Sequence, residues 1–392
     1  MNAERESVRR SGFRPPRIRT VLTLAVISLV VPISMAPAQP GGENPCLGAF
    51  PGAHVANRDG RPLRFGITPA GEAGQLGPPA KAVPEHPERT LAALDRLRPR
   101  DRSIPFVVRL NRLFWSSGEG GLARFLATTR RYTRQGYQVE VQLRYHPAPS
   151  REGDVFGFAR WVRRVVDLFG PNPQVVGLQV TNEANFTYAP DSSDGAYQGA
   201  RDALVQGVLA ARDEVERTGH DQLKIGFSWF YRTDPANEGD YWEYLRTKGG
   251  PAFADAVDWV GLDAYPGTFF PPITSPGGER DAMLNAISVL RECFLPLAGI
   301  GRDVPIHVEE NGFPTGAARS YGRQRDSLSR MVHAVDEYGP SYNVTDYRWF
   351  DLRDANTGSA NFQQHYGLLE DDYTPKPAFG FQYVLSCLNV VS

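Results

Sequence analysis

Residues 121–144 read G-L-A-R-F-L-A-T-T-R-R-Y-T-R-Q-G-Y-Q-V-E-V-Q-L-R and contain two different periodicities in succession. Over 121–135 the apolar residues recur at intervals of three and four, which predicts a helix that buries one stripe of its surface. Gly136 follows at once, where a left-handed glycine commonly caps a helix. Residues 138–144 are β-branched and apolar in alternation, which predicts a strand. The stretch therefore predicts a helix that leads directly into a strand.

The same unit recurs along the chain. Helical patterns at 155–169 and 196–218 are each followed by a glycine, Gly170 and Gly219, that we expect to be a left-handed cap. Short apolar runs predict strands at 63–68, 104–110, 138–144, 175–181, 224–230, 257–265, 304–310 and 344–350. The strand ends lie about 40 residues apart, and eight such units predict an α/β fold, a (β/α)8 or TIM barrel.

An open doubly wound sheet is the alternative for alternating strands and helices. Such a sheet requires a glycine-rich loop between an early strand and the helix that follows it. Residues 71–77 (G-E-A-G-Q-L-G) follow the first predicted strand, but their glycine spacing is wrong and no helical pattern comes directly after them. The sequence therefore favours the closed barrel, formed as a single domain by residues 61–392.

The first 60 residues differ from the rest in composition. Residues 1–20 carry six arginines and two glutamates, an apolar run follows at 21–35, and A-P-A ends at Ala38. These are the parts of a secretory signal peptide, so we expect residues 1–38 to be removed and the protein to be secreted. An uncleaved anchor is the alternative, although the apolar run is short for a membrane span of about 20 residues. Residues 39–60 are interpreted as a linker or an N-terminal cover.

Composition excludes several classes of protein. The 392 residues are 41% apolar and 22% charged with a formal net charge of −1, which excludes extensive disorder, collagen and a coiled coil. No basic stripe is visible, so we do not expect a nucleic-acid partner. Three cysteines without a C-x-x-C motif exclude a metal cage. An exported chain permits one disulfide. We expect Cys46 to pair with Cys387, because the ends of a closed barrel lie close together; three buried free thiols are the alternative.

Polar side chains gather at the ends of the predicted strands, where the active sites of (β/α)8 barrels lie. These strand-end residues are Arg109, His146, Asn182, Glu183, Tyr265, Glu310 and Trp349. An unpaired carboxylate is costly to bury, so Glu183 and Glu310 are unusual as core residues. Two carboxyl groups on opposite sides of one site are what glycoside hydrolysis requires, because one protonates the leaving oxygen and the other attacks the sugar or activates water.

The remaining strand-end residues suit supporting roles. We expect Arg109 and Tyr265 to contact Glu310, Asn182 to bind a sugar hydroxyl and Trp349 to stack on a sugar ring. Side chains alternate between the two faces of a strand, so Glu310 shares its face with Val308. That face is apolar and suits the barrel interior, which places neighbouring Glu309 towards the helices.

Four motifs resemble those of clan A glycoside hydrolases, the retaining (β/α)8 enzymes that include cellulases, mannanases and β-1,3-glucanases. L-Q-V-T-N-E-A-N (178–185) resembles their strand-four Asn-Glu motif, whose Glu is the acid/base. I-H-V-E-E-N-G-F-P-T (306–315) resembles their strand-seven nucleophile motif, with features of families 1 and 17. V-V-R-L (107–110) resembles the strand-two Arg motif, and Y-R-W-F (347–350) resembles the strand-eight Trp motif. His146 is the best match for the strand-three His of family 5, and Arg144 is the alternative.

The resemblance covers roughly residues 60–390 and implies a retaining β-glycoside hydrolase that cleaves a β-glucan or β-mannan, and the signal-peptide pattern predicts that this enzyme is secreted. It implies Glu183 as the acid/base and Glu310 as the nucleophile. The seven histidines form no H-E-x-x-H motif and no G-x-S-x-G occurs, so we expect no metal or other cofactor and no serine hydrolase. The expected partner is carbohydrate, with no membrane for the mature form, and we expect a monomer. The alternatives are a catalytically silent carbohydrate-binding barrel and a transglycosylase that uses the same residues.

Overall fold

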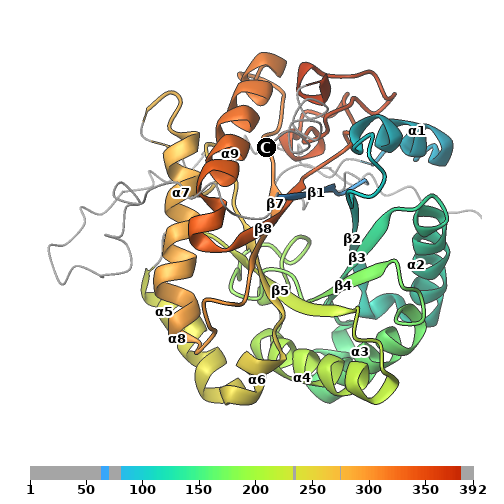
Figure 1. The fold of residues 1–392 in the computed structure, drawn as a ribbon, viewed down its shortest axis with the longest axis vertical. Coiled ribbons are helices and arrows are strands. Elements are labelled where there is room, and N and C mark those ends of the chain that lie inside the picture. The colour runs from blue at the N-terminus through green and yellow to red at the C-terminus, as the bar shows by residue number, and fades with distance from the viewer. Residues whose placement is uncertain (1–62, 70–80, 233–234, 274, 381–392) are drawn as a thin grey trace, which may run out of the picture. The chain divides into compact units, whose positions relative to one another are not determined.

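The computed structural model describes residues 63–69, 81–232, 235–273 and 275–380, which all lie in the compact unit Glu43–Ser392 (Figure 1). Within these ranges, eight parallel strands pair in chain order and β8 closes on β1, so the expected (β/α)8 barrel is confirmed. The strands are β1 (Arg64–Ile67), β2 (Val107–Phe114), β3 (Gln138–Arg144), β4 (Val175–Val180), β5 (Lys224–Phe230), β6 (Trp259–Asp263), β7 (Ile306–Asn311) and β8 (Val344–Trp349).

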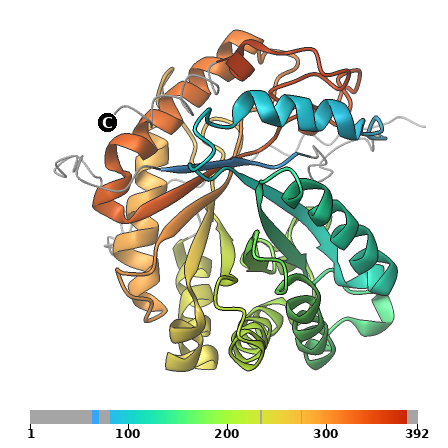
Figure 2. The same ribbon diagram turned by 45° about the vertical axis from the view of Figure 1, so that its right-hand side comes forward.

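Helices surround the strands on the outside (Figures 1 and 2). They are α1 (Pro87–Leu97), α2 (Gly118–Thr133), α3 (Val155–Phe169), α4 (Ala200–Thr218), α5 (Pro235–Tyr244), α6 (Gly250–Ala256), α7 (Glu279–Val289), α8 (Leu295–Leu297) and α9 (Tyr321–Tyr342). The helices predicted from the glycine-terminated patterns correspond to α2, α3 and α4. None of the helices in the described part of the chain has the length and hydropathy needed to cross a bilayer.

Two of the three expected glycine caps have the left-handed conformation. Gly136 and Gly219 have φ of 77° and 71°. Gly170 instead has φ of −57°, so the expectation for this residue was wrong. A Cβ atom at Gly170 would lie 2.2 Å from Cδ2 of His220, and close packing is therefore the reason for glycine at this position.

The strands direct their apolar residues outward. Val139, Val141 and Leu143 of β3 belong to one hydrophobic core together with helix residues such as Phe158 and Val162 of α3. The alternate residues point into the barrel, and most of them are polar. This interior set comprises Arg109, Glu140, Gln142, Gln179, His307, Glu309, Asp346 and Arg348.

In β7 the apolar face therefore lies outside the barrel and the polar face inside it, the reverse of the expected arrangement. Val308 packs in the outer hydrophobic core, whereas Glu309 lies inside the barrel, 3.2 Å from Arg109. The expectation that Glu309 faces the helices was wrong, because the interior of this barrel is filled by charged side chains rather than by branched apolar ones. Glu310 still reaches the barrel mouth because the register of β7 against β8 shifts between Val308 and Asn311.

Glycines on two strands, β1 and β6, make room for the long interior side chains. A Cβ atom at Gly66 would lie 2.7 Å from Cδ of Arg348, and one at Gly261 would lie 2.9 Å from Cγ of Glu309. Such distances are too short for real Cβ contacts, so the interior charges require glycine on the strands beside them.

The expected segments 1–38 and 39–60 lie outside the described residues. Cys293, which lies between α7 and α8, forms a disulfide with a partner that is also outside them. Because the chain has only three cysteines, the expected Cys46–Cys387 pair was wrong, and so was the alternative of three free thiols.

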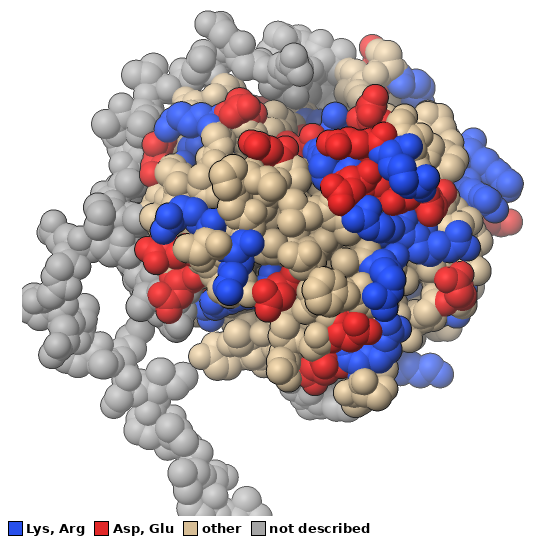
Figure 3. Space-filling view, turned by 90° about the horizontal axis from the view of Figure 1, so that it is seen from below, with Lys and Arg blue, Asp and Glu red and all other residues tan. Residues whose placement is uncertain are grey.

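The surface carries charges of both signs. On the face shown in Figure 3, acidic and basic side chains lie side by side, and no broad area of one sign is present there. Ion pairs join α3 and α4, such as Arg163–Asp213 at 2.7 Å and Arg217–Asp167 at 3.0 Å.

Candidate active site

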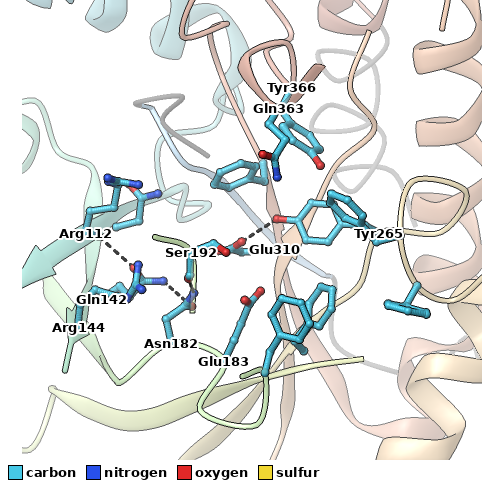
Figure 4. Close-up of a pocket in the computed structure, with 16 residues that line it drawn as sticks. Arg112, Gln142, Arg144, Asn182, Glu183, Ser192, Tyr265, Glu310, Gln363 and Tyr366 are labelled. Atoms are coloured by element: carbon cyan, nitrogen blue, oxygen red, sulfur yellow. Dashed lines mark hydrogen bonds between the residues drawn. The ribbon is translucent and has the colours of Figure 1, made fainter. Parts of the chain in front are cut away.

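A pocket opens at the carboxyl ends of the strands (Figure 4). It is lined by Asn111, Arg112, Gln142, Arg144, Asn182, Glu183, Phe186, Ser192, Phe230, Tyr265, Phe269, Phe270, Glu310, Phe350, Gln363 and Tyr366. Figure 4 shows Glu183 and Glu310 pointing toward one another, with the polar residues of β2 and β3 on one side and Tyr265 and Tyr366 on the other. The structure therefore brings together Glu183, Glu310, Asn182 and Tyr265 of the predicted set.

Glu183 follows β4 in a strained segment of backbone. Thr181 and Glu183 have φ of 62° and 46°, a left-handed conformation that costs a side-chain-bearing residue roughly 1–2 kcal/mol. The segment is held by hydrogen bonds from the Asn182 N–H to Asp194 and from the Glu183 N–H to Ser228 Oγ. These bonds direct the Glu183 carboxyl into the pocket.

The pKa of Glu183 is raised from 4.5 to about 8. Burial is the main cause, and the nearby negative charge of Glu310 adds to it. Hydrogen bonding from Ser193 and the charges of Arg144 and Arg109 act in the opposite direction. Glu183 therefore holds a proton at neutral pH, as a general acid must.

Glu310 has the opposite environment. Nη1 of Arg109 donates to its Oε1 at 2.9 Å, and the Tyr265 hydroxyl donates to its Oε2 at 2.6 Å. Both oxygens of the carboxylate thus accept a hydrogen bond, one of them from a charged donor. Burial and the charge of Glu310 raise the pKa of Tyr265 well above its usual range, so the phenol keeps its proton and remains a donor.

The two carboxyl groups lie close together. An oxygen of Glu183, one of Glu310 and one of Asp263 all lie within 4.8 Å of one another. In retaining glycosidases the two carboxyl groups lie about 5–5.5 Å apart, whereas inverting enzymes need about 6.5–9.5 Å to accommodate a water molecule. The oxygen atoms of Glu183 and Glu310 thus approach more closely than the separation that inverting enzymes need.

Asp263, at the end of β6, is a third carboxyl group that the sequence analysis missed. It is fully buried, and its oxygens have no hydrogen-bond partner of good geometry among the described residues. Burial and the charges of Glu310 and Glu183 raise its pKa well above the usual range. Burial and these charges thus favour the protonated form of Asp263, whereas the charge of Arg109 opposes it. Its position before Ala-Tyr at a predicted strand end was the available signal.

Arg144, not His146, occupies the strand-three side of the pocket. Arg144 is buried and lines the pocket, and its Nε donates to Asp194 Oδ1 at 2.8 Å. His146 lies outside the pocket, with its ring 4.8 Å from Phe114 and 5.0 Å from Tyr197. The expectation for His146 is corrected because Tyr145 and His146 leave the strand and turn away from the mouth. The alternative, Arg144, is the residue in place.

Trp349 is also outside the pocket. Its side chain is fully buried in the outer hydrophobic core, on the same face of β8 as Tyr347. The next residue, Phe350, lines the pocket instead. The expectation for Trp349 was off by one residue because the strand-eight face that bears its aromatic residues packs against the helices. Arg109 likewise lies below the pocket and contacts Glu310 from there.

Aromatic residues form the wall opposite Arg144. Phe230, Tyr265, Phe350 and Tyr366 make a separate buried cluster, against which Phe186, Phe269 and Phe270 pack. Such rings suit the apolar faces of sugars. Of the aromatics that follow predicted strand ends, Phe230, Phe269 and Phe270 thus line the pocket, whereas Trp115 and Tyr231 are buried in the core and Tyr188 is exposed.

Two buried groups have metal-ligand atoms within 4.8 Å of one another, namely Glu183–Asp263–Glu310 and Glu140–His307–Glu309. Arg109 contacts a carboxylate of each group, 2.9 Å from Glu310 and 3.2 Å from Glu309. Arginine therefore already supplies positive charge to both.

Known proteins similar to this chain include β-glucanases. A probable glucan endo-1,3-β-glucosidase of Aspergillus niger is 24% identical over 221 residues, which are 55% of this chain and 42% of that protein. The glucan endo-1,3-β-glucosidase of Pisum sativum is 26% identical over 254 residues, 57% of this chain and 66% of that protein. The chain thus matches less than two thirds of the length of these relatives. No family model matches the sequence.

Solved structures with a similar fold include β-glucosidases. The β-glucosidase of Thermotoga maritima superposes with a TM-score of 0.56 at 13% identity, over 83% of this chain and 97% of that one. The β-glycosidase BGL167 superposes with a TM-score of 0.52 at 14% identity, over 76% of this chain and 85% of that one. The chain is a distant relative of the clan A (β/α)8 glycoside hydrolases. The expected resemblance is confirmed.

Proposed function

We propose that this clan A relative is a retaining β-glucan hydrolase that cleaves internal β-1,3-glucosidic bonds by double displacement. The observation that carries the proposal is the pair of carboxyl groups within 4.8 Å of each other in contrasting surroundings. Glu183 is buried and protonated, whereas Glu310 accepts hydrogen bonds from Arg109 and Tyr265. A protonated acid beside an ionised nucleophile is the starting state of the retaining reaction.

In the first step, Glu310 attacks the anomeric carbon while Glu183 gives its proton to the leaving oxygen, which produces a glycosyl-enzyme ester. Esterification removes the negative charge of Glu310, and with it one cause of the raised pKa of Glu183. Glu183, now ionised, takes a proton from water in the second step as the water attacks the anomeric carbon. The Glu310–sugar bond breaks, and Glu183 is protonated again.

The substrate and the cellular location are inferred from observations other than the geometry of the site. The similarity to endo-1,3-β-glucosidases of Aspergillus niger and Pisum sativum supports a β-1,3-glucan, and the aromatic wall suits glucose rings. The basic, apolar and small-residue segments of residues 1–38 support secretion. We infer a protein that acts outside the cell on polymeric glucan.

A polysaccharide panel tests the proposal. Purified protein is incubated with laminarin, barley β-glucan, cellulose and mannan, and the anomeric protons of fresh products are followed by NMR. We expect laminarin to release oligosaccharides that are first formed as β-anomers. Initial α-anomers would contradict retention, and longer products would indicate transglycosylation. Binding of laminarin without cleavage would support the silent carbohydrate-binding barrel.

A further inference from the structure

Three consecutive residues of the loop between β4 and α4, 192–194, contact Asn182 and Glu183. The buried Ser193 hydroxyl donates to Glu183 Oε2 at 2.5 Å. Ser192 O accepts from Asn182 Nδ2 at 2.8 Å. Asp194 accepts from the Asn182 N–H at 2.9 Å and donates its own N–H to Asn182 O at 2.8 Å. The segment thus binds the backbone, the neighbouring side chain and the carboxyl of the acid/base.

The same segment is fixed from the side of β3. Asp194 is fully buried and accepts from Arg144 Nε at 2.8 Å and from the Tyr145 N–H at 2.9 Å. The Asp194 carboxylate accepts three hydrogen bonds, from Arg144, Tyr145 and Asn182, and so joins the ends of β3 and β4. The neighbouring Ser193 is thereby held beside Glu183. Because the segment is anchored in this way, the hydrogen bond between Ser193 and Glu183 is part of the fixed structure of the site.

We propose that Ser193 is a positioning residue that balances the two protonation states of Glu183, so that one carboxyl serves first as the acid and then as the base. The inference rests on the proposed function and deepens it. A hydroxyl that donates to a carboxylate favours the ionised form. Ser193 thus opposes burial and the charge of Glu310, which favour the protonated form.

Other charged or titratable groups also face Glu183. These charged or titratable groups are Arg109 of β2, Arg144 of β3, Asp263 of β6, Tyr265 after β6, Glu310 of β7 and Tyr366 after β8. Only Ser193 donates a side-chain hydrogen bond to the Glu183 carboxyl among the described residues. Its removal therefore changes the balance without changing a charge.

Loss of the Ser193 hydroxyl should affect the two steps of the reaction differently. Without the hydroxyl, Glu183 keeps its proton to higher pH, which leaves the first step intact. The second step requires Glu183 as a carboxylate, so hydrolysis of the glycosyl-enzyme slows near neutral pH. Loss of Ser193 is expected to act on breakdown of the intermediate more than on its formation.

Ser193→Ala is measured first without any substrate. Glutamate labelled with ¹³C at the side-chain carboxyl is titrated by NMR, and the Glu183 signal is assigned by its loss in Glu183→Gln. Hydrogen bonds to charged groups change a pKa by about one unit or more, so we expect the pKa of Glu183 to rise by about one unit in Ser193→Ala. Ser193→Thr, which restores the hydroxyl, should restore the wild-type value.

Kinetics then separates positioning from stability. The substrate is 2,4-dinitrophenyl β-laminaribioside, whose good leaving group makes breakdown of the intermediate limit kcat. We expect Ser193→Ala to lower kcat about tenfold at pH 6, with kcat/KM within about twofold of wild type. Ser327→Ala is the control, because Ser327 is equally buried and donates to Glu279 on the helical layer. Ser327→Ala should change the stability of the protein without lowering kcat relative to kcat/KM.

The outcomes distinguish the inference from the function on which it rests. An unchanged or lower pKa of Glu183 in Ser193→Ala overturns the role of Ser193, whether or not the protein cleaves glucan. A raised pKa with equal losses in kcat and kcat/KM also overturns it. If wild type cleaves no β-glucan while the pKa still rises in the variant, the proposed function is what fails.

Discussion

Glu309 and Glu310 are adjacent in β7, yet both carboxylates face the inside of the barrel and both contact the guanidinium of Arg109, at 3.2 and 2.9 Å. Regular alternation would place them on opposite faces. The register shift between Val308 and Asn311 makes the arrangement possible. Only Glu310 lines the pocket, so only Glu310 can reach a sugar.

Labelling with a 2-fluoro-laminaribiosyl fluoride tests this difference. We expect the label on Glu310 in peptides of the wild-type protein. Glu310→Ala should give no detectable label, because it lacks the attacking carboxylate. Glu309→Gln keeps the shape beside Arg109 and should still be labelled on Glu310. A sugar found on Glu309 would require the site to be redrawn.

Removal of the proton donor should depend on the leaving group. Glu183→Gln keeps the side-chain shape and removes the acid. Activity on laminarin, whose leaving group is poor, should fall by roughly two to four orders of magnitude. Formation of the intermediate from a dinitrophenyl glycoside needs little protonation and should lose less. Stopped-flow measurement of that step checks the assignment, and an equal loss for both substrates would argue against it.

The raised pKa of Glu183 also predicts a pH-dependent cost in stability. A carboxyl whose pKa rises from 4.5 in the unfolded chain to about 8 in the fold binds more protons when folded. Stability is therefore fully present below about pH 4.5 and declines as the pH rises towards 8. Glu183→Gln should raise the Tm more at pH 8 than at pH 5, as measured by calorimetry. Asp263→Asn should behave similarly, and a larger gain at pH 5 would contradict the sign.

Arg144 should contribute to ligand affinity where His146 does not. Nη2 of Arg144 is buried and has no hydrogen-bond partner among the described residues, although the side chain lines the pocket. Arg144→Lys keeps the charge beside Asp194 but loses this donor. Hydrogen bonds from charged groups are worth about 1.5–3 kcal/mol, so we expect laminaribiose to bind about tenfold or more weakly by calorimetry. His146→Ala should bind within twofold of wild type.

Trp349 and Phe350 should separate stability from binding. Trp349→Phe disturbs a fully buried residue of the outer core and should lower the free energy of unfolding by about 1–3 kcal/mol, with ligand affinity unchanged. Phe350→Ala removes a pocket aromatic and should weaken laminaribiose binding. If Trp349→Phe weakens ligand binding and Phe350→Ala does not, Trp349 is the residue that contacts the ligand.

The sequence predicted the barrel and the chemistry better than the direction of individual side chains. Spacing located all eight strands, and Glu183 and Glu310 were found because carboxylates at strand ends are rarely structural. The face of β7 was assigned wrongly because that argument assumed an apolar interior. Asp263 was missed because its significance depends on distances to residues on other strands, and Ser193 because a loop serine carries no periodic signal.

The polar interior described above also restricts how this barrel can change over time. Arg348 lies 3.6 Å from Glu140, and Gly66 leaves the space that Arg348 fills. Replacing Glu140 removes one of the two carboxylates that face Arg348, the other being Asp346, and a side chain in place of Gly66 would collide with Arg348. The interior positions should therefore be substituted together across homologues, as linked sets, while the apolar residues that face the helices exchange independently of one another.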